Sequence, residues 1–207
     1  MRSLILALII ITSTFASAHA TTYTFTPSPV DLSDLAHQYY YAWGITWTIP
    51  AGEKITEATL TYYNIYDWTR ETNDRLYTHL LDNPLPGSRS YWDNEGGGDN
   101  FAGQGYLVGN WTDPNGGSPT NFNLTYTFSS LGLIDELTLF ANTPYNATRA
   151  NFGFGIDPDC HYYNTNITFS ITTKPIVPEP ATLSLLGFGL LGLLGLGKRK
   201  TTKGGRK

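Results

Sequence analysis

The feature that most constrains the fold is an alternation of apolar and polar side chains that recurs along residues 21–173. In "YAWGITWTIP" (41–50), every second residue from the third onward is large and apolar: Trp43, Ile45, Trp47 and Ile49. A period of two places successive side chains on opposite faces of an extended chain, so the pattern predicts half-buried β-strands rather than helices. The abundance of Tyr, Trp, Phe, Thr and Ile favours strands as well.

Eight segments have this strand-like character, and clusters of Gly, Pro, Asn and Asp separate them: 23–26, 41–50, 57–68, 76–82, 105–112, 121–130, 150–156 and 166–173. Residues 131–142 fit a short helix about as well as a strand. Many short strands with turns between them predict an all-β fold, a single jelly-roll-like β-sandwich. Roughly 150 residues suffice for one hydrophobic core. We assign this ectodomain to residues 21–174.

The first twenty residues are typical of a secretory signal peptide. Arg2 gives a short positive start, residues 4–11 are apolar, and Ala18-His19-Ala20 is a small-x-small cleavage site. The apolar run is too short to span a bilayer as a first transmembrane helix. We therefore expect residues 1–20 to be removed, with Ala18 and Ala20 marking the cleavage site.

The chain ends in three segments of contrasting composition. Residues 175–180 complete the stretch "KPIVPEP", which we expect to be an exposed linker that does not pair in a sheet, because proline has no N–H to donate. Residues 181–197 carry no charge and would form a transmembrane helix of roughly 25 Å, at the short edge for a hydrocarbon core of ~30 Å. Residues 198–207 hold six of the thirteen Lys and Arg residues and are expected to form a basic cytoplasmic tail.

A Pro-Glu-Pro triplet, an apolar run rich in Gly and Leu, and a basic end follow one another from Val177 to Lys200. This order resembles the PEP-CTERM sorting signal of exported Gram-negative bacterial proteins. The resemblance implies export, transient residence in the inner membrane, and processing by an exosortase-type membrane protease. It also implies release to the cell surface or to an extracellular exopolysaccharide matrix of the biofilm type. Pro178, Glu179 and Pro180 would then be the recognition element of the protease and not catalytic groups of this chain.

The part of the chain between the signal peptide and the tail is acidic. Residues 21–197 contain six basic residues and all seventeen Asp and Glu, which leaves a net charge of −11. An acidic exported domain repels nucleic-acid phosphates and anionic lipid head groups. It is compatible with cations and with neutral polysaccharide, although an acidic surface can also serve solubility alone.

The first candidate site is the loop "YWDNEGGGDNFAGQG" (91–105), in which acidic residues surround three glycines: Asp93, Glu95 and Asp99. Oxygen ligands on a flexible loop suit calcium, which accepts six to eight oxygens. The spacing does not match an EF-hand loop. A Gly-rich turn whose Asp and Asn side chains cap the backbone is the alternative.

The second candidate site is "IDPDCHYYN" (156–164), where Asp157 and Asp159 precede Cys160 and His161. The two carboxylates could bind calcium or stabilise a turn, and the whole cluster could bind a transition metal. Catalysis by the cysteine is disfavoured, because adjacent residues of a strand point to opposite faces and His161 cannot easily serve as the base. Cys160 is the single cysteine, so we expect a buried thiol or an intermolecular bridge rather than an internal disulfide.

The third candidate feature is the aromatic content, which comprises five Trp and fourteen Tyr. Most of these rings should fill the core, and a minority could stack on sugar rings at the surface. The sequence contains no Ser-His-Asp order, P-loop, dinucleotide fingerprint or clear pair of carboxylates. We therefore expect a non-enzymatic structural, adhesive or carbohydrate-binding module with calcium as its possible ligand. The alternative is a secreted hydrolase that acts on polysaccharide, which needs two carboxylates about 5–10 Å apart in a cleft.

Overall fold

The alternation along the sequence produces its clearest strand in β11. The computed structural model describes residues 19–94, 97–118, 122–143 and 148–176. In β11, Ile167, Phe169 and Ile171 are fully buried, whereas the residues between them remain partly exposed. The first sheet is antiparallel and follows the order β1-β11-β3-β8. Its strands are β1 (Thr21–Phe25), β3 (Glu53–Tyr63), β8 (Leu124–Thr127) and β11 (Asn166–Pro175).

The second sheet has five antiparallel strands in the order β6-β2-β9-β5-β7. Its central strand β9 is buried along its whole length, because it has a neighbour on each edge and is covered on both faces. The strands of this sheet are β2 (Tyr39–Ile45), β5 (Leu76–Asp82), β6 (Gly87–Trp92), β7 (Tyr106–Trp111) and β9 (Phe152–Pro158).

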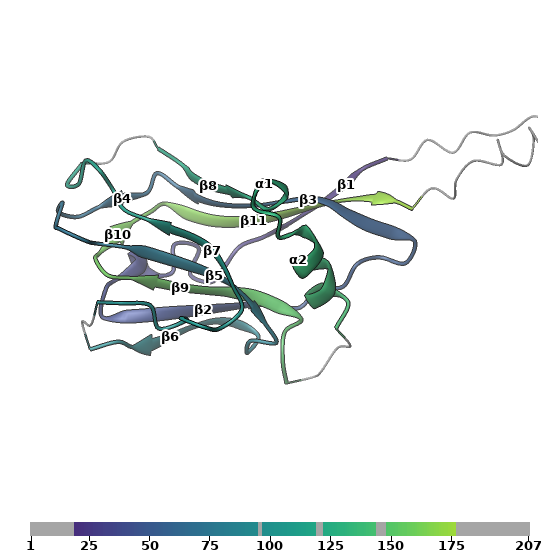
Figure 1. Ribbon diagram of the computed structural model, residues 1–207, viewed down its shortest axis with the longest axis horizontal. Coiled ribbons are helices and arrows are strands. Elements are labelled where there is room, and N and C mark those ends of the chain that lie inside the picture. The colour runs from purple at the N-terminus through teal and green to yellow at the C-terminus, as the bar shows by residue number, and fades with distance from the viewer. Residues whose placement is uncertain (1–18, 95–96, 119–121, 144–147, 177–207) are drawn as a thin grey trace, which may run out of the picture. The chain divides into compact units, whose positions relative to one another are not determined.

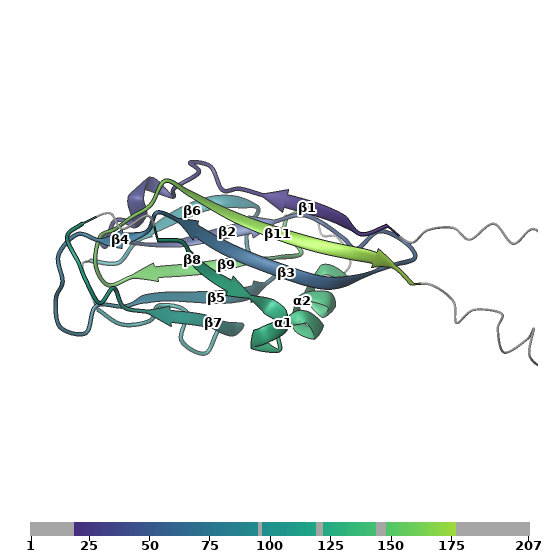
Figure 2. The ribbon, with the colours of Figure 1, turned by 90° about the horizontal axis from the view of Figure 1, so that it is seen from above.

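The two sheets form the layers of a sandwich, as Figures 1 and 2 show. The chain crosses repeatedly between them, because β1, β3, β8 and β11 lie in one sheet and β2, β5, β7 and β9 in the other. Apart from β6, which extends an edge, the strand orders are β1-β11-β3-β8 and β2-β9-β5-β7. This is the connectivity of an eight-stranded jelly roll. The expectation of an all-β fold is confirmed.

Aromatic rings fill the space between the two sheets. The ring of Phe169 lies 4.8 Å from that of Phe154, 5.3 Å from that of Phe128 and 5.9 Å from that of Phe152, measured between centroids. All four side chains are fully buried. Because each buried aromatic side chain stabilises the fold by roughly 1.5–3 kcal/mol, this cluster is a main source of stability.

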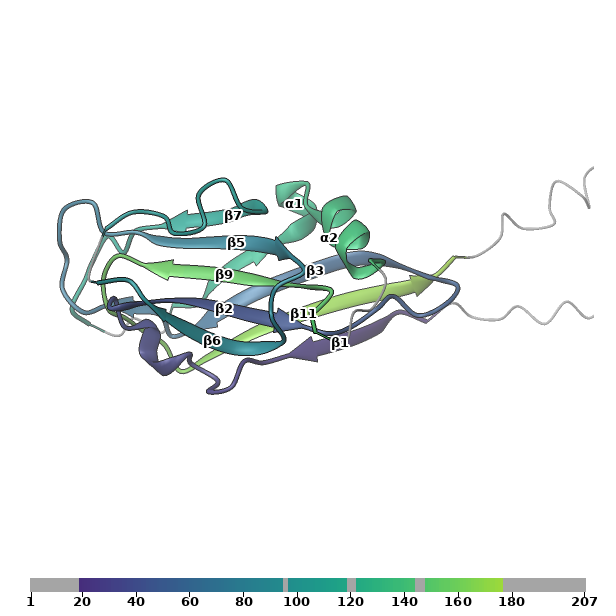
Figure 3. The same cartoon turned by 90° about the horizontal axis from the view of Figure 1, so that it is seen from below.

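Two short helices follow β8, α1 (Phe128–Leu131) and α2 (Ile134–Ala141), and Figure 3 shows them beside the sandwich. The ambiguous segment 131–142 is therefore largely helical. Leu137, Phe140 and Ala141 are buried on one side of α2, at the spacing of a helix face.

Several strand boundaries differ from the sequence-based expectation. The strand expected at 41–50 starts two residues earlier and ends at Ile45, although Trp47 and Ile49 still pack against the core. The strand expected at 121–130 is short, because α1 begins at Phe128. β6 was not expected, since its "GSRSYW" lacks large apolar residues before the last two positions and lies at a sheet edge.

The expectation that the chain from Lys174 onward cannot pair is wrong for two residues. Lys174 pairs with Lys54 and Pro175 with Glu53. At Pro175 the sheet has a partner on one edge only, because β1 reaches no further than Thr173. Proline is tolerated at such a place, where its missing N–H removes no ladder bond.

The two ends of the sandwich differ in what they carry. β1 begins and β11 finishes at one end (Figure 1), and the opposite end holds a small sheet of two short strands, β4 (Tyr66–Asp67) and β10 (Tyr162–Tyr163). A short 3-10 turn, η1 (Ser33–Leu35), lies near β10.

Within the described ranges, no helix is long and apolar enough to cross a membrane. The expected transmembrane helix at 181–197, the basic tail and most of the signal peptide lie outside those ranges.

Candidate functional site

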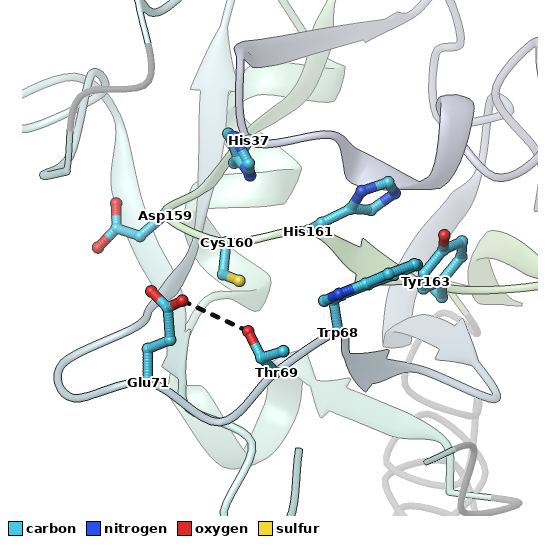
Figure 4. Close-up of a pocket in the computed structure, with 8 residues that line it drawn as sticks. All are labelled: His37, Trp68, Thr69, Glu71, Asp159, Cys160, His161 and Tyr163. Atoms are coloured by element: carbon cyan, nitrogen blue, oxygen red, sulfur yellow. Dashed lines mark hydrogen bonds between the residues drawn. The ribbon is translucent and has the colours of Figure 1, made fainter. Parts of the chain in front are cut away.

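An open cavity of about 620 Å³ lies where β4 and β10 meet the turns around them. Three chain segments contribute its walls: the segment after η1, the loop from β4 to β5, and the turn from β9 to β10. Figure 4 shows two carboxylates on one side of Cys160 and three rings on the other. The lining residues are His37, Trp68, Thr69, Glu71, Asp159, Cys160, His161 and Tyr163.

One wall of the cavity is a stack of rings. The His161 and Tyr163 rings are 4.5 Å apart and nearly parallel, and Trp68 lies 5.4 Å from Tyr163. Tyr66 stacks on Tyr163 from β4 at 5.2 Å. The backbone N–H of Trp68 donates to the backbone carbonyl of His161 at 3.0 Å, which fixes the two segments relative to each other. Trp68 is 54% exposed, so part of its ring can receive a ligand.

His161 takes part in this wall through its ring rather than through its charge. Burial lowers the pKa of the imidazole, so the ring is neutral at physiological pH. Its Nε2 atom is buried and has no hydrogen-bond partner among the described residues. The side chain stacks against aromatic rings while Cys160 lies in the floor, as the alternation of neighbouring residues predicts.

Cys160, which lines the cavity, belongs to a compact cluster of buried donors. One donor atom from each of Asp67, Asp74 and Cys160 lies within 4.8 Å of the other two. Burial raises the pKa of Asp67 to about 6, and burial together with the neighbouring Asp67 raises the pKa of the Cys160 thiol to about 12. The expectation of a buried thiol is confirmed.

The acidic residues predicted at 93–99 and 157–159 lie close together in the fold. The Asp157 carboxylate accepts a hydrogen bond from the backbone N–H of Asn100 at 2.6 Å, and that of Asp159 accepts one from Gly98 at 2.9 Å. Asn100 also donates from its side chain to Asp93 at 2.6 Å. The two candidate loops are therefore parts of a single acidic region.

Two further contacts fix the loop that carries Asp99. His79 Nε2 on β5 and Asp99 Oδ2 form a hydrogen bond of 2.9 Å, and Asp99 also accepts the backbone N–H of Phe101. Phe101 packs directly over Gly155 of β9, where a Cβ atom would come within 2.6 Å of the ring. The glycine thus permits the loop to lie flat against the sheet.

The acidic region has features of a turn and features of a cation site. Most of its carboxylate oxygens already accept backbone or side-chain N–H groups, as a capping role requires. Asp157 is fully buried, burial raises its pKa to about 6, and its Oδ1 has no hydrogen-bond partner among the described residues. Oδ2 of Asp93 is also buried and has no hydrogen-bond partner among the described residues. Glu95 lies outside the described residues, so calcium binding stays a prediction.

Sequence reasoning missed Asp67, Asp74 and Glu71 as site residues. All three lie in "YDWTRETND" (66–74), which reads as the end of a strand followed by a polar turn. Nothing in local spacing connects this segment with Cys160, more than eighty positions later in the chain. The pairing of β4 with β10 brings the two segments together in the fold.

Comparisons with known proteins address the C-terminal segment alone. Residues 177–200 match the family described as the PEP-CTERM protein-sorting motif, which confirms the resemblance. The motif is that of exported proteins that an exosortase, a membrane protease, sorts toward the cell surface. Pro178, Glu179 and Pro180 belong to the matched range and lie outside the described residues. No curated protein matches the chain.

Proposed function

We propose that this exported chain, which carries a PEP-CTERM sorting motif, is a non-enzymatic module of the cell surface or extracellular matrix that binds carbohydrate. The observation that carries the proposal is the cavity beside β4 and β10, in which an exposed tryptophan stands opposite two carboxylates. Sugar-binding sites need this combination, because a sugar has apolar C–H faces and a polar rim of hydroxyl groups.

The two kinds of group in the cavity would contact different parts of a sugar. The half-exposed ring of Trp68 offers an apolar face against which a pyranose could stack. Glu71 and Asp159 offer acceptors for hydroxyl groups, and Thr69 offers a hydroxyl of its own. The excess of acidic residues favours a neutral polysaccharide over an anionic one.

The position of the cavity within the sandwich suits a surface module. β11 leads into the sorting segment from the end of the sandwich opposite β4 and β10 (Figure 1). The cavity therefore lies at the end of the sandwich opposite the end of β11.

A polysaccharide hydrolase is the second candidate, because Glu71 and Asp159 line the same cavity. Both lie on turns rather than on strands. Asp159 is already held by the N–H of Gly98, and Glu71 accepts from the Thr69 hydroxyl at 3.4 Å. Carboxylates that fix turns are better suited to binding than to proton transfer, and we therefore favour the binding module.

Electrophoresis in gels that contain neutral polysaccharides tests this proposal. We expect one of the polysaccharides to retard the protein, and Trp68→Ala to weaken the interaction at least about tenfold, as expected for a central aromatic contact. Trp92→Ala is the matched control, because Trp92 is 60% exposed but does not line the cavity. Equal retardation of the Trp68 and Trp92 variants, or no retardation across a broad panel, would contradict the proposal.

A further inference from the structure

Cys160, which lines the cavity, lies close to two buried carboxylates from a distant part of the sequence. Asp67 belongs to β4, Asp74 precedes β5, and Cys160 lies in the turn after β9. One donor atom from each lies within 4.8 Å of the other two. The exposed fractions of the residues are 1% for Asp67 and 7% for each of the others, so water screens the cluster poorly.

The two carboxylates of this cluster lack a basic partner. Within the described parts of the chain, the one close contact between a basic and an acidic side chain joins His79 to Asp99, and it does not include Asp67 or Asp74. Buried carboxylates are stable when they are paired with a cation, coordinate a metal or take up a proton. Among the described residues, no basic side chain pairs with either carboxylate.

Two polar atoms of the cluster are also left without hydrogen bonds. Oδ1 of Asp67 and the hydroxyl oxygen of Tyr162 are both buried and have no partner among the described residues. Burial, and after it the charges of Asp67, Asp74 and Cys160, raise the pKa of the Tyr162 hydroxyl. Buried polar atoms usually have partners, so these two atoms point to a ligand.

Other contacts hold Asp67 and Asp74 in place. The N–H of Asp67 donates to Asp113 at 3.0 Å, and the second carboxylate oxygen of Asp113 accepts from Asn115. The Asp74 carboxylate accepts a hydrogen bond from the backbone N–H of Glu71. The backbone carbonyl of Asp74 accepts one from the Thr112 hydroxyl. The backbone around the donors is thus fixed before any ligand binds.

We propose that Asp67, Asp74 and Cys160 bind a divalent transition-metal ion of the zinc class. A thiolate among the ligands selects zinc-like ions over calcium and magnesium, which prefer oxygen alone. Zinc bonds of about 2.0–2.3 Å need donor atoms somewhat closer than the upper limit seen here, which small side-chain rotations provide. Because Cys160 also lines the cavity, an ion could reach the cluster from it.

Binding would exchange a proton for the metal at Cys160. The S–H bond breaks, the sulfur keeps the electron pair and donates it to the ion, and the proton passes to the buffer. No electron is transferred, and no other reactant is needed. This inference is independent of sugar binding, since Trp68 is not one of the three donors.

Cobalt titration of the full chain, purified in detergent without a histidine tag and freed of metal by dialysis, tests the site. We expect one Co²⁺ to bind per chain with the near-ultraviolet absorption band of a thiolate-to-cobalt bond, and Zn²⁺ to displace it. Cys160→Ser should abolish the band, and Asp67→Asn should weaken binding at least about tenfold, a loss typical of metal-site substitutions. Trp68→Ala is the control and should retain both band and affinity.

Two results would overturn the inference. The first is the lack of a thiolate band in the wild-type chain at millimolar Co²⁺, a result that needs no variant to fold. The second is metal binding of unchanged affinity in both Cys160→Ser and Asp67→Asn, which would locate the ion elsewhere. Circular dichroism of each variant shows whether it is folded, and Asp74→Asn replaces either variant if it is not.

Discussion

The pair β3–β11 and the pair β4–β10 are both antiparallel, but their roles differ. β11 pairs with β3 throughout its ten residues, buries Ile and Phe on one face and exposes Thr and Ser on the other. β4 and β10 have two residues each, yet they carry Asp67 and Tyr162, both buried and incompletely hydrogen-bonded. The comparison teaches that regular pairing provides the stability, whereas the short pair holds polar groups whose burial is unfavourable without a ligand.

The largest effect on stability should come from the long pair. Phe169→Ala removes the ring at the centre of the aromatic cluster and should lower the free energy of unfolding by about 3–5 kcal/mol. Trp68→Ala, at the short pair, should change it by less than about 1 kcal/mol, because much of that ring is exposed. Urea denaturation of both variants measures the difference. Equal losses in the free energy of unfolding for the two variants would mean that the long pair is not the main source of stability.

The next largest effect on stability should come from calcium, at the end of the sandwich that carries β4 and β10. The acidic region that includes Asp99 and Asp157 is weakened by repulsion among like charges, which a bound cation would reverse. A hundredfold excess over Kd contributes about 2.7 kcal/mol, or a rise in melting temperature on the order of 5–10 °C. Magnesium at equal ionic strength should raise it less.

Single substitutions locate the origin of that effect. Asp157→Asn and Asp99→Asn, made separately, should each reduce the response to calcium if both loops contribute ligands. A melting temperature identical in calcium and in chelator, at matched ionic strength, would leave the region as turn structure only.

Acidification should stabilise the protein in the presence of a chelator. Burial raises the pKa of Asp67 and of Asp157 to about 6, above the value of an unfolded aspartate. Between those values the folded state binds more protons than the unfolded state, so the free energy of unfolding falls as pH rises. His161 opposes this, because burial lowers its pKa.

With two aspartates against one histidine, we expect a net gain on the order of 1–2 kcal/mol from pH 7 to pH 5. Asp67→Asn and Asp157→Asn together should abolish this gain and leave the opposite dependence from His161. A stability that rises from pH 5 to pH 7 in the wild-type chain would show that these carboxylates are not destabilised by burial.

The smallest effect should come from the outer face of the long pair. The hydroxyl groups of Thr24 and Ser170 are 3.1 Å apart on the exposed surface. Thr24→Val keeps the β-branched shape and should change the free energy of unfolding by less than about 0.5 kcal/mol. A change above 1 kcal/mol, measured by the same urea denaturation, would show that this face is covered in the folded protein.

The long strands could be predicted from the sequence, because alternation depends on neighbours along the chain. Ile167, Phe169 and Ile171 show their burial by spacing alone. β4 and β10 could not be predicted as a pair, since two-residue strands have no periodicity. Asp157 and Asp159 can be predicted as candidates, because acidic residues lie close together in that part of the sequence. Asp67 and Asp74 cannot, because only the pairing of β4 with β10 brings them near Cys160.

The central proposal is that the cavity binds sugar without cleaving it. The direct test incubates the protein with the polysaccharide that retards it and measures bound protein and newly formed reducing ends in the same sample. We predict binding that depends on Trp68 and no reducing ends above those of the Trp68→Ala variant. Reducing ends that increase with time, and that disappear in Glu71→Gln or Asp159→Asn, would contradict the account and identify a hydrolase.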